Sequence, residues 1–242
     1  MKKLLLLALL VPSLALANEE GPNLDQAHYD LGDQASLQRG AKVFVNYCLS
    51  CHSANYMRYS RLEQIGLSEK QIKENLLFAG EKVGETMNVA LNPKEAKGFF
   101  GATPPDLSVI ARSRGADWLY TYLRGFYRDD TRPTGWNNTV FDKVGMPHVL
   151  YQLQGEQVLH VEEHEDSHGV KHEVKTLVLA KPGTMKPAEY DALVGDLVNY
   201  LVFMGEPAQQ QRKALGIVVL LFLGLFFVVA YYLKKEYWKD IH

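Results

Sequence analysis

The hydrophobic pattern divides the chain into two apolar ends and a mixed middle. Near the start, residues 4–11 are apolar and follow Lys2 and Lys3. Small residues at positions 15 and 17 complete the order typical of a secretory signal peptide, which we expect to span residues 1–17. The apolar run itself is too short to cross a bilayer.

The second apolar end runs from Ala214 to Leu233 without a charged residue. As a helix it would reach roughly 30 Å, which is the thickness of the hydrocarbon core, so it predicts a transmembrane segment. Tyrosine, tryptophan and lysine side chains follow it, as they do at membrane interfaces. Because the signal exports what precedes the anchor, we expect an anchor over residues 212–233 and a cytoplasmic tail over residues 234–242.

Between these ends, residues 18–211 predict an exported domain that is mainly α. Apolar residues at helical spacing predict helices over residues 34–47, 68–79, 107–112, 117–125 and 187–204. Two stretches rich in loop-forming residues predict loops over residues 81–101 and 126–138. Alternating residues from Leu150 to Leu179 predict a β-hairpin with a polar tip. A linker over residues 208–213 would then lead into the anchor.

The two cysteines of the chain lie in one pentapeptide, Cys48-Leu49-Ser50-Cys51-His52. This spacing is typical of c-type haem attachment, in which two thiols tether the porphyrin and the next histidine binds the iron. A thioredoxin-like pair would need a βαβ setting, and a zinc site would need further ligands. We therefore predict one covalent haem c, attached through Cys48 and Cys51, with His52 as the proximal ligand.

An iron that transfers electrons needs a sixth ligand, and a methionine thioether favours the reduced state. The candidates after the motif are Met57, Met87, Met146, Met185 and Met204. Met57 is too close to reach the other haem face, and Met204 lies on an apolar helix face. Met146, between Gly145 and Pro147, is best placed, and Met185 is second.

Other polar residues suggest weaker sites. Haem propionates need cationic partners when they are buried, for which Arg112 and Arg114 are candidates. Histidines at 160, 164, 168 and 172 lie among acidic residues in the predicted hairpin. Fourfold spacing would align them as a metal site on a helix, but the alternating pattern favours a solvated polar tip.

The net charge of −2 becomes more negative without Lys2 and Lys3, which favours a basic protein partner over nucleic acid.

Four motifs surround these candidates. They are Arg39-Gly40 through Phe44 leading into Tyr47-Cys48, Pro104-Pro105-Asp106-Leu107-Ser108 followed by Ala111-Arg112, Arg124-Gly125-Phe126-Tyr127, and Gly145-Met146-Pro147. With these motifs, the chain resembles the cytochrome c1 family, the haem subunits of ubiquinol-cytochrome c reductase, over nearly its whole mature length. The second and fourth motifs are the more diagnostic. A proline directly after Met146 is similar to the bacterial branch of the family.

The resemblance implies a helical haem domain like those of class I cytochromes c, with loop insertions and one C-terminal transmembrane helix. It implies that Met146 is the distal ligand and that Arg112 supports a haem propionate. It also implies a bacterial inner-membrane protein with its haem domain in the periplasm. The partners would be cytochrome b, the Rieske iron-sulfur protein and cytochrome c, within a dimeric complex.

In that function the chain carries single electrons from the Rieske protein to cytochrome c and has no substrate chemistry of its own. Two alternatives stay open on the sequence. One is a stand-alone anchored cytochrome that donates to a terminal oxidase. The other is a haem sensor or peroxidase, which would need an open sixth position on the iron.

Overall fold

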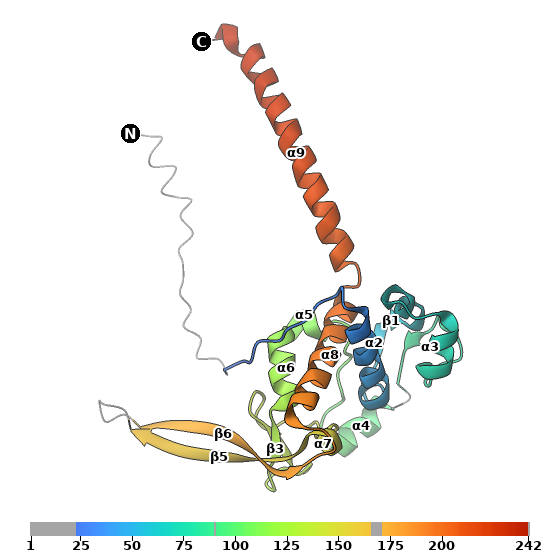
Figure 1. The fold of residues 1–242 in the computed structure, drawn as a ribbon, viewed down its shortest axis with the longest axis vertical. Helices are drawn as coiled ribbons and strands as arrows, with labels where there is room; N and C mark the ends of the chain where they lie inside the picture. The colour runs from blue at the N-terminus through green and yellow to red at the C-terminus, as the bar shows by residue number, and fades with distance from the viewer. Residues whose placement is uncertain (1–22, 90, 166–170, 242) are drawn as a thin grey trace.

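The computed structural model describes residues 23–241 except 90 and 166–170. It has a mainly helical head from which one long helix and one two-stranded arm extend in different directions (Figure 1). The predicted signal peptide, residues 1–17, lies outside the described residues. The mainly α architecture with a β-hairpin and a long apolar C-terminal helix agrees with the predicted fold class.

Most elements before the last hairpin are short helices and short strands. In chain order they are α2 (Gln34–Val43), the π-helix η1 (Phe44–Cys48), β1 (Ala54–Arg58), the 3-10 helix η2 (Tyr59–Ile65), α3 (Glu69–Asn75), β2 (Thr86–Met87), α4 (Pro93–Phe100), α5 (Ile110–Arg114), α6 (Ala116–Arg124), β3 (Phe126–Arg128), β4 (Trp136–Asn138), α7 (Tyr151–Gln154), β5 (Gly155–Glu165), β6 (Lys171–Pro182), α8 (Pro187–Gly205), α9 (Gln209–Tyr237) and η3 (Lys239–Ile241).

The centre of the head is the pair of helices α2 and α8. Their backbones approach so closely at Gly40 that an added Cβ would lie 2.1 Å from the carbonyl oxygen of Asp196. Asn199, which is 2% exposed, donates from Nδ2 to the Ser36 hydroxyl at 2.9 Å and to the Asp30 carbonyl at 2.8 Å. Glycine therefore permits the close contact, and one buried amide joins α8 to the start of α2.

The predicted helix over residues 34–47 is divided by a change of helix type. α2 begins with the Asp33 carboxylate accepting from the Ser36 N–H at 3.0 Å and ends at Val43. The next five residues, Phe44 to Cys48, form the π-helix η1. A π turn is wider than an α turn, so the chain enters the cysteine motif in a different register from the one that α-helical spacing predicts.

Two of the predicted loops contain regular structure. The stretch over residues 81–101 includes β2 and α4, and α4 begins where the Asn92 side chain accepts from the Lys94 N–H at 2.9 Å, with Pro93 in the first turn. The stretch over residues 126–138 forms the antiparallel pair β3 and β4, with Phe126 opposite Asn138. Both loop predictions were wrong, because the glycines and prolines mark the ends of short elements as well as loops.

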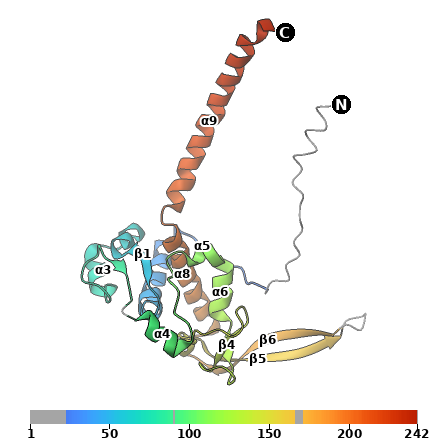
Figure 2. The same ribbon diagram turned by 180° about the vertical axis from the view of Figure 1, so that it is seen from behind.

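The predicted hairpin is confirmed, with changed ends. β5 and β6 pair antiparallel from Gly155 opposite Pro182 to Glu165 opposite Lys171. Residues 151–154 form α7 instead of strand, and β6 continues to Pro182. Seen from behind, the hairpin projects from one side of the head while α3 lies at the other (Figure 2).

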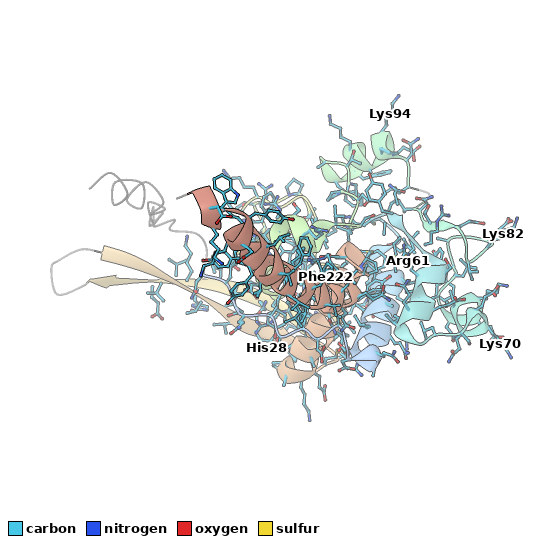
Figure 3. The ribbon with its side chains drawn as sticks, turned by 90° about the horizontal axis from the view of Figure 1, so that it is seen from above. His28, Arg61, Lys70, Lys82, Lys94 and Phe222 are labelled. Atoms are coloured by element: carbon cyan, nitrogen blue, oxygen red, sulfur yellow. The ribbon has the colours of Figure 1, made fainter. Side chains whose placement is uncertain are left out.

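The long C-terminal helix α9 is apolar enough and long enough to cross a membrane. It begins at Gln209, so only Glu206, Pro207 and Ala208 separate it from α8, and the longer linker predicted over residues 208–213 was wrong. Seen from above, the labelled side chains of Lys70 in α3, of Lys82 and of Lys94 in α4 reach outward on the side away from the hairpin (Figure 3). Phe222 of α9 is 64% exposed, as expected for a helix surrounded by lipid.

Candidate haem site

The cysteine motif forms one helical turn that places the two predicted tethers and the predicted proximal ligand together. The N–H groups of Cys51 and His52 both donate to the carbonyl of Cys48, at 3.0 and 2.8 Å. Residues three and four apart share one face of a helix, so both cysteines and the histidine face the same way. All three line one cavity of about 360 Å³.

The two cysteines do not form a disulfide with each other. Both cysteines are free, and each is partly exposed to the cavity. Burial raises the pKa of the Cys48 thiol to about 12, and the neighbouring Cys51 adds to the shift. A thiol that stays protonated is a poor disulfide-exchange nucleophile, which disfavours the thioredoxin-like alternative.

His52 is held in the tautomer that an iron ligand needs. Its ring is 9% exposed, and its Nδ1 lies 2.7 Å from the carbonyl oxygen of Pro105. Because a carbonyl can only accept, Nδ1 carries the proton and Nε2 keeps a free lone pair. Burial lowers the pKa of His52, which further favours the neutral imidazole.

The Pro-Pro-Asp-Leu-Ser motif holds the histidine segment along its length. Asp106 accepts from the Asn55 N–H at 2.7 Å, and the Ser108 hydroxyl accepts from the Tyr56 N–H at 3.0 Å. The Leu107 N–H donates to the Ser53 carbonyl at 2.8 Å. These contacts give each residue of the motif a physical role. The two prolines form a stiff backbone whose carbonyl accepts from His52, and the next three residues bind this backbone to the segment that leads into β1.

The rest of the cavity wall is mostly apolar and comes from several elements. The lining residues outside the cysteine motif include Phe100, Pro104, Leu107, Ile110, Trp118, Tyr122, Phe141, Val149, Leu197 and Leu201. An apolar cavity that also contains two thiols, a neutral imidazole and a thioether suits a haem, whose macrocycle is apolar and whose iron takes nitrogen and sulfur ligands. The donor set and the lining therefore fit the predicted cofactor.

Met146 is the methionine in this wall. Of the five methionines that the structure describes, the other four do not line the cavity. Met57, Met87 and Met204 are buried in the main core, and Met185 packs against that core near the hairpin base. The structure thus brings Met146 and His52 to one cavity and leaves Met185, the second candidate, elsewhere.

A small cluster beside the cavity supports the Met146 segment. Phe126, Trp136 and Val144 form its buried part, and Tyr122 and Met146 pack against it. The Tyr122 hydroxyl donates to the Met146 sulfur at 3.4 Å. In the sequence, Tyr122 is marked only by its spacing of four residues from Trp118, which places both rings on one face of a helix.

The two candidate arginines occupy different places. Arg114 lines the cavity and lies over the Trp118 ring, with its guanidinium carbon 5.0 Å from the ring centroid. Arg112 is not among the cavity residues. Its Nη1 lies 4.0 Å from the carboxylate of Glu206, which also accepts from Arg212 Nη2 at 3.1 Å. Support of a haem propionate by Arg112 therefore stays a prediction. Arg114, which lines the cavity, is a second candidate for the same role.

The histidine-rich hairpin lies apart from the cavity. His160 is exposed, and the register places it opposite Thr176. His168 lies outside the described residues. No hairpin residue lines the cavity, as far as the structure describes the hairpin.

Several known proteins are similar to this chain over most of its length. The model of the "Cytochrome C1 family" matches residues 26–86 and 79–241. The chain is 49% identical to "Cytochrome c1" of Allochromatium vinosum, over the full length of both proteins. It is 55% identical to "Ammonia monooxygenase gamma subunit" of Nitrosomonas europaea, over 100% of this chain and 98% of that protein.

A more distant relative is the mitochondrial "Cytochrome c1, heme protein" of Saccharomyces cerevisiae, 25% identical over 88% of this chain and 69% of that protein. Haem binding and electron transfer as a subunit of a bc1-type reductase complex follow from membership in this family. The family match covers the cysteine motif, the proline motif and the Met146 segment in one chain. The chain belongs to the cytochrome c1 family.

Proposed function

We propose that the chain carries one haem c, attached by thioether bonds to Cys48 and Cys51 and ligated by His52 and Met146. The bound haem supplies a one-electron redox centre. The single observation that carries the proposal is the His52 Nδ1 contact with Pro105 at 2.7 Å, because it leaves Nε2 free in a cavity that also contains the Met146 thioether. The chain's part is to fix both ligands and to exclude water from the iron.

The ligand assignment is tested by substituting Met146 and Met185 separately with leucine. The Met146→Leu variant loses the absorption band of a methionine-ligated ferric haem and falls in reduction potential, whereas Met185→Leu keeps both. If the spectrum of Met146→Leu were unchanged, the ligand would move to Met185. Carbon monoxide binding to the reduced wild-type protein at full occupancy would favour the sensor or peroxidase alternative instead.

Covalent attachment has its own measurement. In a denaturing gel stained for haem, the wild-type band keeps its cofactor because two thioether bonds resist detergent. Replacement of both cysteines with serine abolishes the stain, and retention of stain in that double variant would reject the tether.

The propionate partner is best proposed as Arg114, because it lies on the cavity wall. A cation near a buried carboxylate offsets the cost of its burial. Arg112→Gln and Arg114→Gln form a matched pair. The reduction potential shifts in Arg114→Gln and stays near wild type in Arg112→Gln; the reverse order would return the role to Arg112.

The physiological direction is electron transfer from the Rieske iron-sulfur protein to cytochrome c, beside cytochrome b and within a dimeric complex. The proposed topology has a signal over residues 1–17, a periplasmic haem domain over 18–211, an anchor over 212–233 and a cytoplasmic tail over 234–242. Its support is the apolar helix α9 together with the family membership. Protease treatment of intact spheroplasts, which cleaves only the periplasmic side, tests the orientation.

A second candidate function comes from the relative whose name places it in an ammonia monooxygenase. Purification of the full-length chain in mild detergent separates the possibilities. Cytochrome b and a Rieske protein, with haems b and c both present, support the reductase. Monooxygenase subunits would support the second candidate, and a lone haem c protein would support the stand-alone cytochrome.

A further inference from the structure

The hydroxyl of Tyr122 is the polar side-chain group that contacts the sulfur of Met146. Tyr122 lies on α6, lines the cavity and donates to Met146 Sδ at 3.4 Å. A thioether sulfur is a large, weak acceptor, and hydrogen bonds to sulfur are longer than those to oxygen. The distance of 3.4 Å falls within the range for sulfur. The same cavity wall therefore contains the proposed ligand and a donor directed at its ligating atom.

The ring that carries this hydroxyl is fixed on several sides. It stacks on Trp118, with ring centroids 4.7 Å apart and planes 12° apart, and it meets the edge of Phe126 at 5.1 Å. The carbonyl of Tyr122 accepts from Nδ2 of Asn138, a residue that is 2% exposed, at 2.8 Å. Ring and backbone are thus both held, and the donor has a defined position.

The segment that carries Met146 is held from the same cluster. His148 stacks on Phe126 with centroids 4.8 Å apart and planes 3° apart, and it is 3% exposed. On the other side of Met146, the Lys143 N–H donates to the Asn137 side chain at 2.9 Å. The segment is thus held on both sides of Met146, by Phe126 and by Asn137, and the donor ring packs on the same Phe126, so the fold sets the distance between hydroxyl and sulfur.

We propose that Tyr122 is a positioning residue for Met146, whose hydroxyl orients the thioether and raises the reduction potential of the haem. This inference rests on the proposed ligation by Met146. A thioether sulfur has two lone pairs, and a hydrogen bond to one leaves the other for the iron. The bond withdraws electron density from the sulfur, which disfavours the ferric state more than the ferrous state.

The test is the Tyr122→Phe variant of the full-length protein, purified with its membrane anchor and titrated electrochemically. The ring and its stacking remain while the hydroxyl is lost. We expect the equilibrium constant for reduction to fall about three- to tenfold, which is a drop of roughly 28 to 59 mV at 59 mV per tenfold for one electron. Haem content and the methionine-to-iron band stay as in the wild type.

The matched control is Tyr120→Phe on the same helix. Tyr120 does not line the cavity. The guanidinium carbon of Arg124 lies over the Tyr120 ring, 4.5 Å from the ring centroid. We expect this control to keep the wild-type potential. A Tyr122→Phe potential equal to or above that of the control overturns the inference, and so does loss of the methionine band at full haem content.

The Met146→Leu spectrum separates this inference from the proposed function. If Met146→Leu leaves the wild-type band in place, the ligand assignment fails and the inference fails with it. If Met146→Leu removes the band while Tyr122→Phe leaves the potential unchanged, the ligand stands and only the role of Tyr122 is rejected.

Discussion

The helix pair α2–α8 and the hairpin β5–β6 differ in how much of each is buried against the rest of the molecule. The helices meet over buried side chains, with backbone in contact at Gly40 and a buried amide at Asn199. The hairpin has two strands, and Val161 and Val178 are 49% and 46% exposed. A two-stranded ribbon gains little stability by itself. The helices that support the haem site are therefore stabilised by buried contacts, whereas the hairpin is stabilised mainly by the contacts where it joins the head.

The largest loss of stability is expected from Gly40→Ala, which introduces a side chain between α2 and α8. The new Cβ would lie 2.1 Å from the Asp196 carbonyl oxygen and 2.7 Å from the Tyr200 Cβ, so the helices must separate. We expect a loss of about 3 kcal/mol in the free energy of unfolding, measured by denaturant titration of the purified protein. Gly195→Ala is the control, since nothing lies within 4 Å of its Cβ and a helical alanine stabilises by up to about 1 kcal/mol. Equal stabilities of the two variants would contradict the close contact.

A smaller loss is expected from Asn199→Ala. It removes the hydrogen bonds from the amide to the buried Ser36 hydroxyl and to the Asp30 carbonyl, which then keeps the Asp33 N–H as a donor. The expected cost is about 1 to 2 kcal/mol in the same titration. Asn46→Ala serves as the comparison, because the Asn46 side chain is exposed and its loss should cost less than about 0.5 kcal/mol. A wild-type midpoint for Asn199→Ala would mean that water replaces the amide without cost.

At the hairpin root, Glu156→Gln should loosen the strands without loosening the helices. Hydrogen bonds from Arg128 and Lys181 hold the pKa of the Glu156 carboxyl below its usual 4.5. A lowered folded pKa gives stabilisation that is present above pH 4.5 and is lost as the pH falls through the folded value. We expect faster amide exchange in β5 and β6 of the variant at pH 7, and no difference from the wild type at low pH. A difference that persisted in acid would point to lost packing instead of lost charge.

The smallest effect on the head is expected from shortening the hairpin. Val158 and Val178 are opposite in the register, so an Asn-Gly turn can join them in place of residues 159–177. This keeps Gln157, whose Nε2 donates to the carbonyls of Arg124 and Phe126 at 2.9 Å. We expect the haem spectrum and the unfolding midpoint of the head to stay at wild-type values. A shifted methionine band would show that the hairpin reaches the site.

The parts of the site that the sequence could predict are those set by local spacing. Cys48, Cys51 and His52 come together because three- and four-residue separations share a helix face. The carbonyl partner of His52 is 53 residues away in the chain, and no local pattern specifies that contact. Arg112 and Arg114 differ by two residues, so one helical turn directs them to different sides, and only tertiary packing decides which one meets the cavity.

The fold divides in the same way. The capping box at Ser68 and Gln71 and the apolar face of α8 are local signals. α8 forms as predicted, whereas the helix predicted over residues 68–79 begins as expected and already ends at Asn75. α4 was missed although Asn92 and Pro93 are a good helix start, because eight residues give little periodicity to read. The change to a π turn at Phe44 has no local signature in the sequence. In the structure Phe44 is fully buried, and its ring centroid lies 5.6 Å from that of Tyr200.

The junction at Glu206 has a mechanical consequence. Three residues separate α8, which contributes Leu197 and Leu201 to the cavity wall, from the anchor helix α9. The Glu206 carboxylate holds Arg212 of the anchor and lies near Arg112 of α5, so it braces the junction from both sides. Because the junction is this short and is ion-paired on both sides, movements of α9 are coupled to α8 and so to the wall of the cavity.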